Sequence, residues 1–269
     1  MKVPDFTTDA TDSLCRDIAK RSKGVCILGL SGGKDSLCAY LSLSRYFRRI
    51  IPFHCASWPG VDFVTKYLDY LEYELQTKIL RLMGEDFPMA FARGMYQPFS
   101  EIEASEAAYV EDYSKLDIVD YLRYMYSLPR AWCAFGISKN DSIDRLIYCR
   151  QYGGKSENNR TFYPCWDWPR KEIIRAITES GIKLPSDYRY SSRNLGGIPS
   201  TTVNRILREH YPQAYGRMLA CYPTAEAKTV REMLLDVEWE VARDAAIRAR
   251  GGKAASPVED EDGEGDSDG

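Results

Sequence analysis

The segment of the sequence best suited to chemistry spans six consecutive residues: Ser31, Gly32, Gly33, Lys34, Asp35 and Ser36. Its two glycines lack a Cβ, so backbone N–H groups can close around an anion. Its serine hydroxyls can donate to phosphate oxygens, and its lysine adds a positive charge. Its aspartate can hold Mg²⁺ directly or through water, because Mg²⁺ prefers carboxylate and water oxygens. The segment predicts a phosphate-binding loop, with Lys34 and Asp35 as catalytic candidates.

The residues on either side of this segment predict the elements that a phosphate loop needs. Residues 24–30, GVCILGL, form a short apolar run bounded by glycine, which is typical of a buried parallel strand. The apolar residues after Ser36 recur at helical spacing, so a helix begins near Asp35. Its first N–H groups have no partner within the helix and, with the helix dipole, attract an anion. Strand, loop and helix form one unit.

The order of residues in the loop separates two classes of nucleotide-binding protein. A Walker loop needs a glycine five positions before its Gly-Lys pair and a Ser or Thr after the lysine. Here Leu28 stands at the first place and Asp35 at the second. The order Ser-Gly-Gly-any-Asp-Ser resembles the PP-loop family, the ATP pyrophosphatases. The resemblance implies ATP bound on residues 31–36 and cleaved between its α- and β-phosphates; a plain glycine turn is the alternative.

A second segment resembles one branch of that family, which contains phosphoadenylyl-sulfate (PAPS) reductases, sulfate adenylyltransferase small subunits and DNA phosphorothioation sulfurtransferases. The branch carries a strand followed by Gly-x-Arg-x-x-Glu-Ser-x-x-Arg. In this chain the apolar run at 131–135 is followed by residues 136–145, in which Gly136, Ser142 and Arg145 match. The resemblance implies nucleotide binding at Gly136, Ile137 and Ser142.

The same segment departs from the branch at two positions. Asp141 stands in place of the glutamate, and Ser138 in place of the first arginine, with Lys139 beside it as a substitute charge. Arg145 is placed to pair with a phosphate or sulfate at the carboxyl edge of the sheet. The alternative is a surface ion pair with Asp141 or Asp144.

A third stretch, residues 164–168, matches a Pro-x-x-Asp-Trp pattern of the branch. We expect Trp166 and Trp168 in the core, with stacking on a base as the alternative. The Glu-Cys-Gly-Leu-His segment that ends PAPS reductases has no counterpart, and residues 193–197 read RNLGG where iron–sulfur cysteines would stand. We therefore expect nucleotide chemistry without an intrinsic redox thiol.

Composition narrows the class of protein further. The chain has 269 residues, 44% of them hydrophobic, and no run of eighteen apolar residues. Residues 1–10 do not resemble a secretory signal, so we expect a cytoplasmic protein without a membrane contact. The cysteines lie too far apart along the chain for zinc or iron–sulfur ligation, and Cys26, Cys38 and Cys133 are expected as buried free thiols.

Charge is distributed unevenly. The chain carries a net charge of −3, yet residues 259–269 contain seven acidic residues and no basic one, which leaves the rest at +4. A mildly basic body fits a nucleotide or nucleic acid ligand. The acidic run reads as a disordered, solubilising tail, with transient occupation of the basic cleft as the alternative.

Apolar runs and helical patterns alternate along the chain, which predicts an α/β fold with a parallel sheet flanked by helices. The resemblance implies an adenine nucleotide alpha hydrolase-like fold. We expect a nucleotide-binding domain at 1–200, a helical extension at 201–252 and a disordered acidic tail at 253–269. The expected strands are 24–30, 50–55, 78–82, 131–137 and 161–165. The expected helices are 8–22, 61–77, 101–113, 116–126, 141–151, 169–180, 200–220 and 225–249, with loops at 153–160 and 185–199.

The combined site prediction has two groups of residues. Catalytic candidates are Lys34, Asp35 and Arg145, with Asp35 also the candidate Mg²⁺ ligand. Nucleotide-binding candidates are residues 31–36 together with Ala56, Ser57, Gly136, Ile137 and Ser142. Expected cofactors are ATP and Mg²⁺.

Three functions remain open at this point. The first is an enzyme that adenylates a base or a small metabolite, so that nitrogen or sulfur can be inserted. The second is a protein that binds phosphoadenylyl sulfate and takes its sulfur chemistry from a partner. The third is a nucleotide-binding subunit without catalysis in a larger complex.

Overall fold

The computed structural model describes residues 2–58, 61–86, 90, 112–191 and 201–227, and residues 230, 231, 234, 235 and 241 beyond them. The chain divides into two units, Met1–Ala225 and Glu226–Gly269. Every element described below belongs to the first unit. The domain limits expected at residues 200 and 252 stay predictions.

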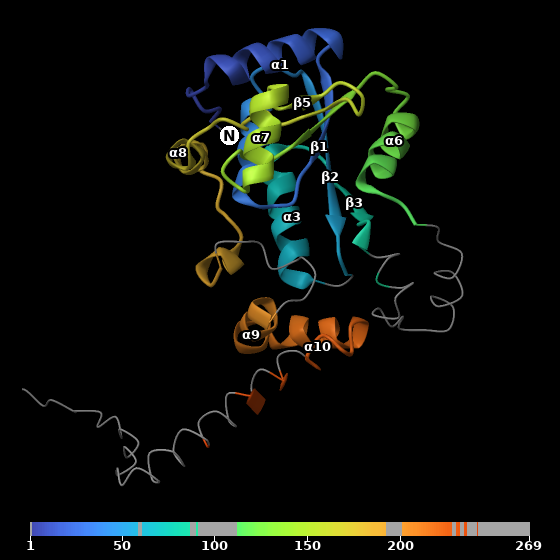
Figure 1. The fold of residues 1–269 in the computed structure, drawn as a ribbon, viewed down its shortest axis with the longest axis vertical. Coiled ribbons are helices and arrows are strands. Elements are labelled where there is room, and N and C mark those ends of the chain that lie inside the picture. The colour runs from blue at the N-terminus through green and yellow to red at the C-terminus, as the bar shows by residue number, and fades with distance from the viewer. Residues whose placement is uncertain are drawn as a thin grey trace, which may run out of the picture. The chain divides into compact units, whose positions relative to one another are not determined.

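The first unit contains a six-stranded sheet with the strand order β3-β2-β1-β4-β6-β5 (Figure 1). The strands are β1 (Val25–Gly29), β2 (Arg49–Ala56), β3 (Leu80–Met83), β4 (Trp132–Phe135), β5 (Lys155–Ser156) and β6 (Thr161–Phe162). All neighbouring pairs are parallel except β5 with β6. Strands β2 and β3 follow β1 in the chain and lie on one side of it in the sheet. The next strand, β4, lies on the other side of β1. The strand order thus reverses between β1 and β4, where open α/β sheets bind ligands.

The helices connect the strands and cover both faces of the sheet. They are α1 (Asp9–Arg21), α2 (Lys34–Leu43), α3 (Asp62–Leu75), α6 (Lys115–Met125), α7 (Ile143–Tyr152), α8 (Arg170–Ser180), the 3₁₀ helix η1 (Ser186–Arg189), α9 (Thr201–His210) and α10 (Pro212–Cys221). Helix α6 lies on one side of the sheet and α8 on the other (Figure 1). The α/β fold with a mostly parallel sheet is confirmed.

Both faces of the sheet are apolar. Successive side chains of a strand point to opposite faces, and in β1 the side chains on each face are apolar. Cys26 and Leu28 of β1 belong to the core under α2 and α8, whereas Ile27 packs on the opposite face with Val119 of α6. Such double burial explains why β1 reads as an uninterrupted apolar run.

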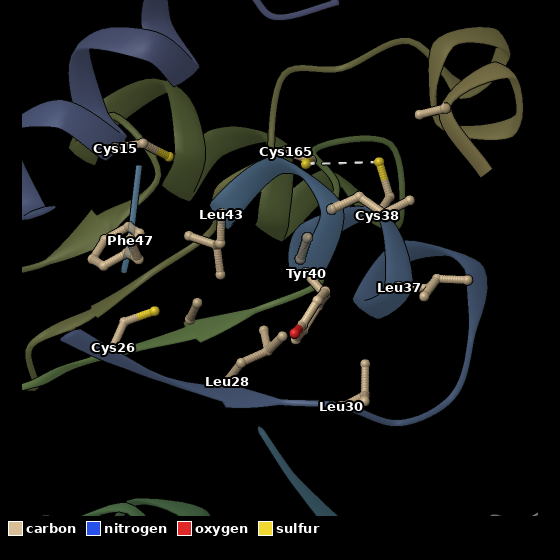
Figure 2. Close-up of a cluster of buried hydrophobic side chains, with 14 of the residues drawn as sticks. Cys15, Cys26, Leu28, Leu30, Leu37, Cys38, Tyr40, Leu43, Phe47 and Cys165 are labelled. Atoms are coloured by element: carbon tan, nitrogen blue, oxygen red, sulfur yellow. Dashed lines mark hydrogen bonds between the residues drawn. The ribbon is translucent and has the colours of Figure 1, made fainter. Parts of the chain in front are cut away.

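The larger core contains several of the cysteines (Figure 2). The sulfur of Cys38 in α2 lies 3.8 Å from that of Cys165, and both thiols are buried and free. Cys26 and Cys133 are also buried and free, so the expectation for these thiols is confirmed. Burial raises the pKa of the Cys165 thiol well above its usual value, which keeps it protonated and inert.

Pro52 lies within a strand, where a proline is normally confined to an edge or to the first residue. It lies inside β2, which pairs with both β1 and β3. Leu30 N donates to Phe53 O at 2.7 Å, so the backbone of Phe53 faces β1 and that of Pro52 faces away from it. Pairing with β3 begins only at Phe53, so the missing N–H of Pro52 removes no ladder bond.

Two expectations need correction. The segment 153–160 contains strand β5 and is not a loop throughout; Arg21 of α1 also binds Glu157 there, with Nη2 at 2.6 Å from Oε2. The helix expected over 200–220 is two helices, because Pro212 starts a new one after Tyr211. Residues 101–111 and 192–199, most of 225–249, and the acidic tail lie outside the described residues, so the predictions for them stay predictions.

Candidate functional site

The predicted loop lies where β1 meets α2, at the reversal of strand order. Gly32 has a φ of +80°, a left-handed conformation that favours glycine, and Gly33 is the N-cap of α2. Ser31 Oγ lies 3.1 Å from Ser36 Oγ and accepts from Gly33 N at 3.3 Å. The loop thus folds back on itself and directs the first turn of α2 toward the edge of the sheet.

The second predicted segment touches the first one directly. A Cβ added to Gly136 would lie 2.3 Å from the backbone nitrogen of Ser36 and 2.5 Å from the carbonyl carbon of Asp35. Real Cβ atoms do not approach backbone atoms so closely, so only glycine allows the end of β4 to pack against the start of α2. Two motifs a hundred residues apart in the chain meet at this contact.

Both motifs line one cavity of about 640 Å³, a size suited to a nucleotide. Its lining residues are Ser31, Gly33, Lys34, Asp35, Ser36, Gly136, Asn140, Asp141, Ser142, Arg145, Arg170 and Tyr188. Lys34, Arg145 and Arg170 supply three positive charges against the carboxylates of Asp35 and Asp141. The excess of positive charge suits a polyphosphate.

Arg145 reaches the cavity from the first turn of α7. Ser142 caps this helix by accepting from Arg145 N at 3.2 Å. The guanidinium Nη1 lies 2.6 Å from Asp141 Oδ2, which also accepts from Ser138 N at 3.0 Å. The ion pair considered as the alternative for Arg145 is therefore present, and it fixes the arginine at the cavity wall with about half of its side chain exposed.

Lys34 and Asp35 are the first two residues of helix α2. The ammonium of Lys34 pairs with the neighbouring carboxylate of Asp35. About a quarter of the Asp35 side chain is exposed, on the cavity side. One carboxylate beside a phosphate site fits Mg²⁺, which usually takes one or two carboxylates and completes its shell with phosphate oxygens and water. Among the described residues, no cluster of three or more His, Cys, Asp or Glu could hold a metal by itself.

Four lining residues were not among the predicted ones: Asn140 and Asp141, which lie within the matched segment 136–145, and Arg170 and Tyr188, which lie outside both motifs. Arg170 begins α8, directly after Pro169 at its N-cap. Tyr188 comes from η1, and its hydroxyl accepts from Lys34 N at 3.0 Å. Burial raises the pKa of Tyr188, so its hydroxyl keeps its proton near neutral pH. An arginine that opens a helix after proline is a weak signal in the sequence, and no spacing pattern points to Tyr188.

Other predicted residues lie elsewhere. Ile137 lines a second, adjoining cavity. Gly32, Ala56 and Ser57 are not among the lining residues of the two cavities. Ser57 is buried and its hydroxyl donates to Asp86 at 3.3 Å. A nucleotide-binding role for Gly32, Ala56 and Ser57 stays a prediction.

The tryptophans occupy structural positions. Trp168 is fully buried in the core and packs edge-on against Phe6, with ring centroids 5.0 Å apart. Trp166 is partly buried against the same core, and its ring lies over Gly154. The core placement of Trp168 is confirmed.

No helix in the described part of the chain has the length and apolar character that a bilayer span requires. Comparison with models of known protein families finds no match, and comparison with curated proteins finds none either.

Comparison with solved structures finds distant likenesses. The chain is similar to the U34-tRNA thiolase NcsA from Methanococcus maripaludis, with 15% identity, a TM-score of 0.40, and coverage of 78% of this chain and 76% of that one. It is similar to the NH3-dependent NAD synthetase from Campylobacter jejuni, with 16% identity, a TM-score of 0.39, and coverage of 93% and 98%. It is similar to the NAD+ synthetase from Burkholderia pseudomallei, with 14% identity, a TM-score of 0.35, and coverage of 87% and 91%. Likenesses at these identities and TM-scores show no function for this chain.

Proposed function

We propose that this chain is an enzyme of the PP-loop type that cleaves ATP to AMP and pyrophosphate and adenylates an acceptor. The observation that carries the proposal is the convergence of two motifs on one cavity. The loop at residues 31–36 and the segment at residues 136–145 both line it, at the reversal of strand order. The polyphosphate of ATP fits beside the N-terminus of α2, where backbone N–H groups and Lys34 attract it.

The reaction forms one bond to the α-phosphorus and breaks another. An acceptor oxygen attacks the α-phosphorus, the bond to the oxygen that bridges the α- and β-phosphates breaks, and pyrophosphate leaves with that oxygen and the electron pair. A nitrogen or sulfur nucleophile then displaces AMP. Lys34 and Arg145 act by neutralising charge that moves onto pyrophosphate and by holding the groups in line. Asp35 would hold Mg²⁺, which when bound would neutralise further charge on the phosphates.

A labelled-nucleotide experiment tests the proposal. Excess protein is incubated with Mg²⁺ and ATP labelled in its α-phosphate, with water as the default acceptor, and the products are separated by chromatography. We expect AMP and no ADP. Lys34→Ala should lose this product, whereas Lys20→Ala, at an exposed position of α1, should keep it.

The outcomes separate the functions that the sequence leaves open. ADP as the product would contradict cleavage between the α- and β-phosphates. Tighter binding of phosphoadenylyl sulfate than of ATP, in a competition assay, would favour the sulfonucleotide function. ATP binding without any cleavage, even with nucleotide and metabolite acceptors added, would favour a non-catalytic subunit.

A further inference from the structure

A second cavity of about 490 Å³ opens beside the first one. The two cavities share Ser31, Ser36, Gly136 and Arg145 in their linings. The two cavities therefore adjoin at the place where the phosphate loop packs against Gly136, just after β4. A molecule in the second cavity would lie next to the site where we place the polyphosphate of ATP.

The chemistry of the second cavity differs from that of the first. Lys115 and Arg145 supply positive charge, and the described residues of its lining include no carboxylate. Both cations have an ion partner: Glu85 lies 3.3 Å from Lys115 Nζ, and Asp141 lies 2.6 Å from Arg145 Nη1. All four side chains are partly exposed, so the two positive charges are only partly offset. The cavity therefore suits an anionic ligand.

The remaining lining residues suit a planar ring with hydrogen-bonding edges. Phe135 and Tyr163 provide aromatic surface, and Asn159 and the buried Thr161 provide donors and acceptors. Burial raises the pKa of Tyr163, so its hydroxyl stays protonated and able to donate. Aromatic surface next to polar edges is the usual environment of a nucleobase in proteins.

We infer that the second cavity binds a nucleotide as the acceptor of the adenylyl group, with its base near Phe135 and Tyr163 and its phosphate near Lys115 and Arg145. The inference rests on the proposed function, because the adjoining site must hold ATP. Arg145 borders both cavities and can contact both ligands. The volume lies within the range of 300–1,000 Å³ that is typical for small-molecule sites, so one nucleotide fits.

Two sources could supply this chemistry: a free mononucleotide or a nucleotide within a single strand. The probes are the four radiolabelled nucleoside 5′-monophosphates, in equilibrium dialysis, and fluorescein-labelled single-stranded RNA and DNA of mixed sequence, in anisotropy. Both are added to protein saturated with α,β-methylene-ATP, which cannot be cleaved between its α- and β-phosphates. Binding of the strands alone identifies nucleic acid as the source, and binding of the monophosphates identifies a free nucleotide.

The variant Lys115→Glu tests the cavity, with Lys78→Glu as the matched control. Both lysines are exposed and each pairs with one glutamate, Glu85 and Glu72 respectively, so both exchanges leave the core intact. We expect Lys115→Glu to weaken binding of the probe at least tenfold and to leave the affinity for α,β-methylene-ATP within twofold. Lys78→Glu should change neither.

Two results would overturn the inference. An equal loss of α,β-methylene-ATP and probe binding in Lys115→Glu would show that the second cavity holds part of ATP. Absence of probe binding to the loaded wild-type protein would show that the acceptor is not a nucleotide. Failure of the wild-type protein to bind α,β-methylene-ATP at all is a separate result, which contradicts the proposed function itself.

Discussion

The phenolic oxygen of Tyr188 lies 3.0 Å from the backbone nitrogen of Lys34 and accepts its N–H, across 154 positions of the chain. It also lies 3.1 Å from where a Cβ on Gly33 would stand. The hydroxyl of Tyr188, which belongs to η1, thus contacts the phosphate loop at Gly33 and Lys34. A hydroxyl both accepts and donates, so while it accepts from Lys34 its own proton is able to reach a bound phosphate.

Replacement of Tyr188 by phenylalanine tests this contact. Tyr188→Phe removes one hydrogen bond to the loop and one donor to phosphate, each with a net worth of about 0.5–1.5 kcal/mol. Together these losses amount to about 1–3 kcal/mol, so we expect ATP affinity, measured by calorimetry with Mg²⁺, to fall between about fivefold and 160-fold. Tyr67→Phe, at a hydroxyl that donates to Lys183 O outside the cavity lining, is the control and should keep wild-type affinity. Tighter ATP binding in Tyr188→Phe would show instead that the hydroxyl competes with phosphate for the amide.

The close approach of Gly136 to α2 predicts a severe effect of a single methyl group. In Gly136→Ala the new Cβ would meet the backbone of Asp35 and Ser36, which cannot move without displacing the loop. We expect a loss of about 1–3 kcal/mol of stability, as for overpacked cores, and loss of ATP binding. Gly216→Ala in α10 is the matched control, since no atom of the described part of the chain lies within 4 Å of its Cβ position, and it should be neutral or slightly stabilising. Denaturant titration and calorimetry give the two quantities, and unchanged ATP affinity in Gly136→Ala would contradict the loop geometry.

Asp35 is the predicted holder of Mg²⁺, and Asp35→Asn removes its charge while keeping its shape. The fold should persist, because a first-turn carboxylate contributes only about 0.3–1 kcal/mol to a helix. Formation of AMP should be abolished. Asp62→Asn, in the first turn of α3 and outside the cavity, is the control for the helix effect. AMP formation at the wild-type rate over a full Mg²⁺ titration of Asp35→Asn would rule out the metal role.

The phosphate loop was predictable from the sequence because its information is local. The apolar run of β1, the glycines and the start of α2 follow one another, so strand, loop and helix could be read in order. The role of Gly136 was predictable only by resemblance. The reason for glycine there is the backbone of Ser36, which no local pattern contains.

The missed features depend on partners distant in the chain. Strand β5 has two residues and exists because β6 pairs with it, so its polar sequence shows no strand pattern. The tolerance of β2 for Pro52 depends on where β3 begins to pair with it, which the sequence does not show. Tyr188 reaches the loop from a short 3₁₀ helix, and its position depends on how that turn packs. In each case tertiary packing, rather than residue type, decided the structure.

His54 of β2 connects the stability of the sheet to pH. Its ring is buried, and Nδ1 lies 3.0 Å from the carbonyl oxygen of Leu30, the residue before the phosphate loop. Burial lowers the pKa of His54 below its usual 6.5, and the charge of Arg81 lowers it further, while the hydrogen bond to Leu30 opposes the shift. In the unfolded chain the ring takes up a proton near pH 6.5, whereas in the folded chain it does so only at lower pH. The contribution of neutral His54 is therefore complete above pH 6.5 and is lost as the pH falls toward the folded-state pKa.

The variant His54→Gln removes this titration and keeps an amide that can donate to Leu30. Between pH 7 and pH 5 we expect the wild-type protein to lose more of its free energy of unfolding than the variant, by at most about 1.4 kcal/mol for each pH unit below 6.5. Carboxylates titrate alike in both proteins, so the difference between the two denaturant titrations isolates His54. A parallel fall of both proteins over this range would contradict a depressed pKa. A steeper fall of the variant would mean that the folded state prefers the charged ring, and that the contact with the Leu30 carbonyl outweighs the cost of burial.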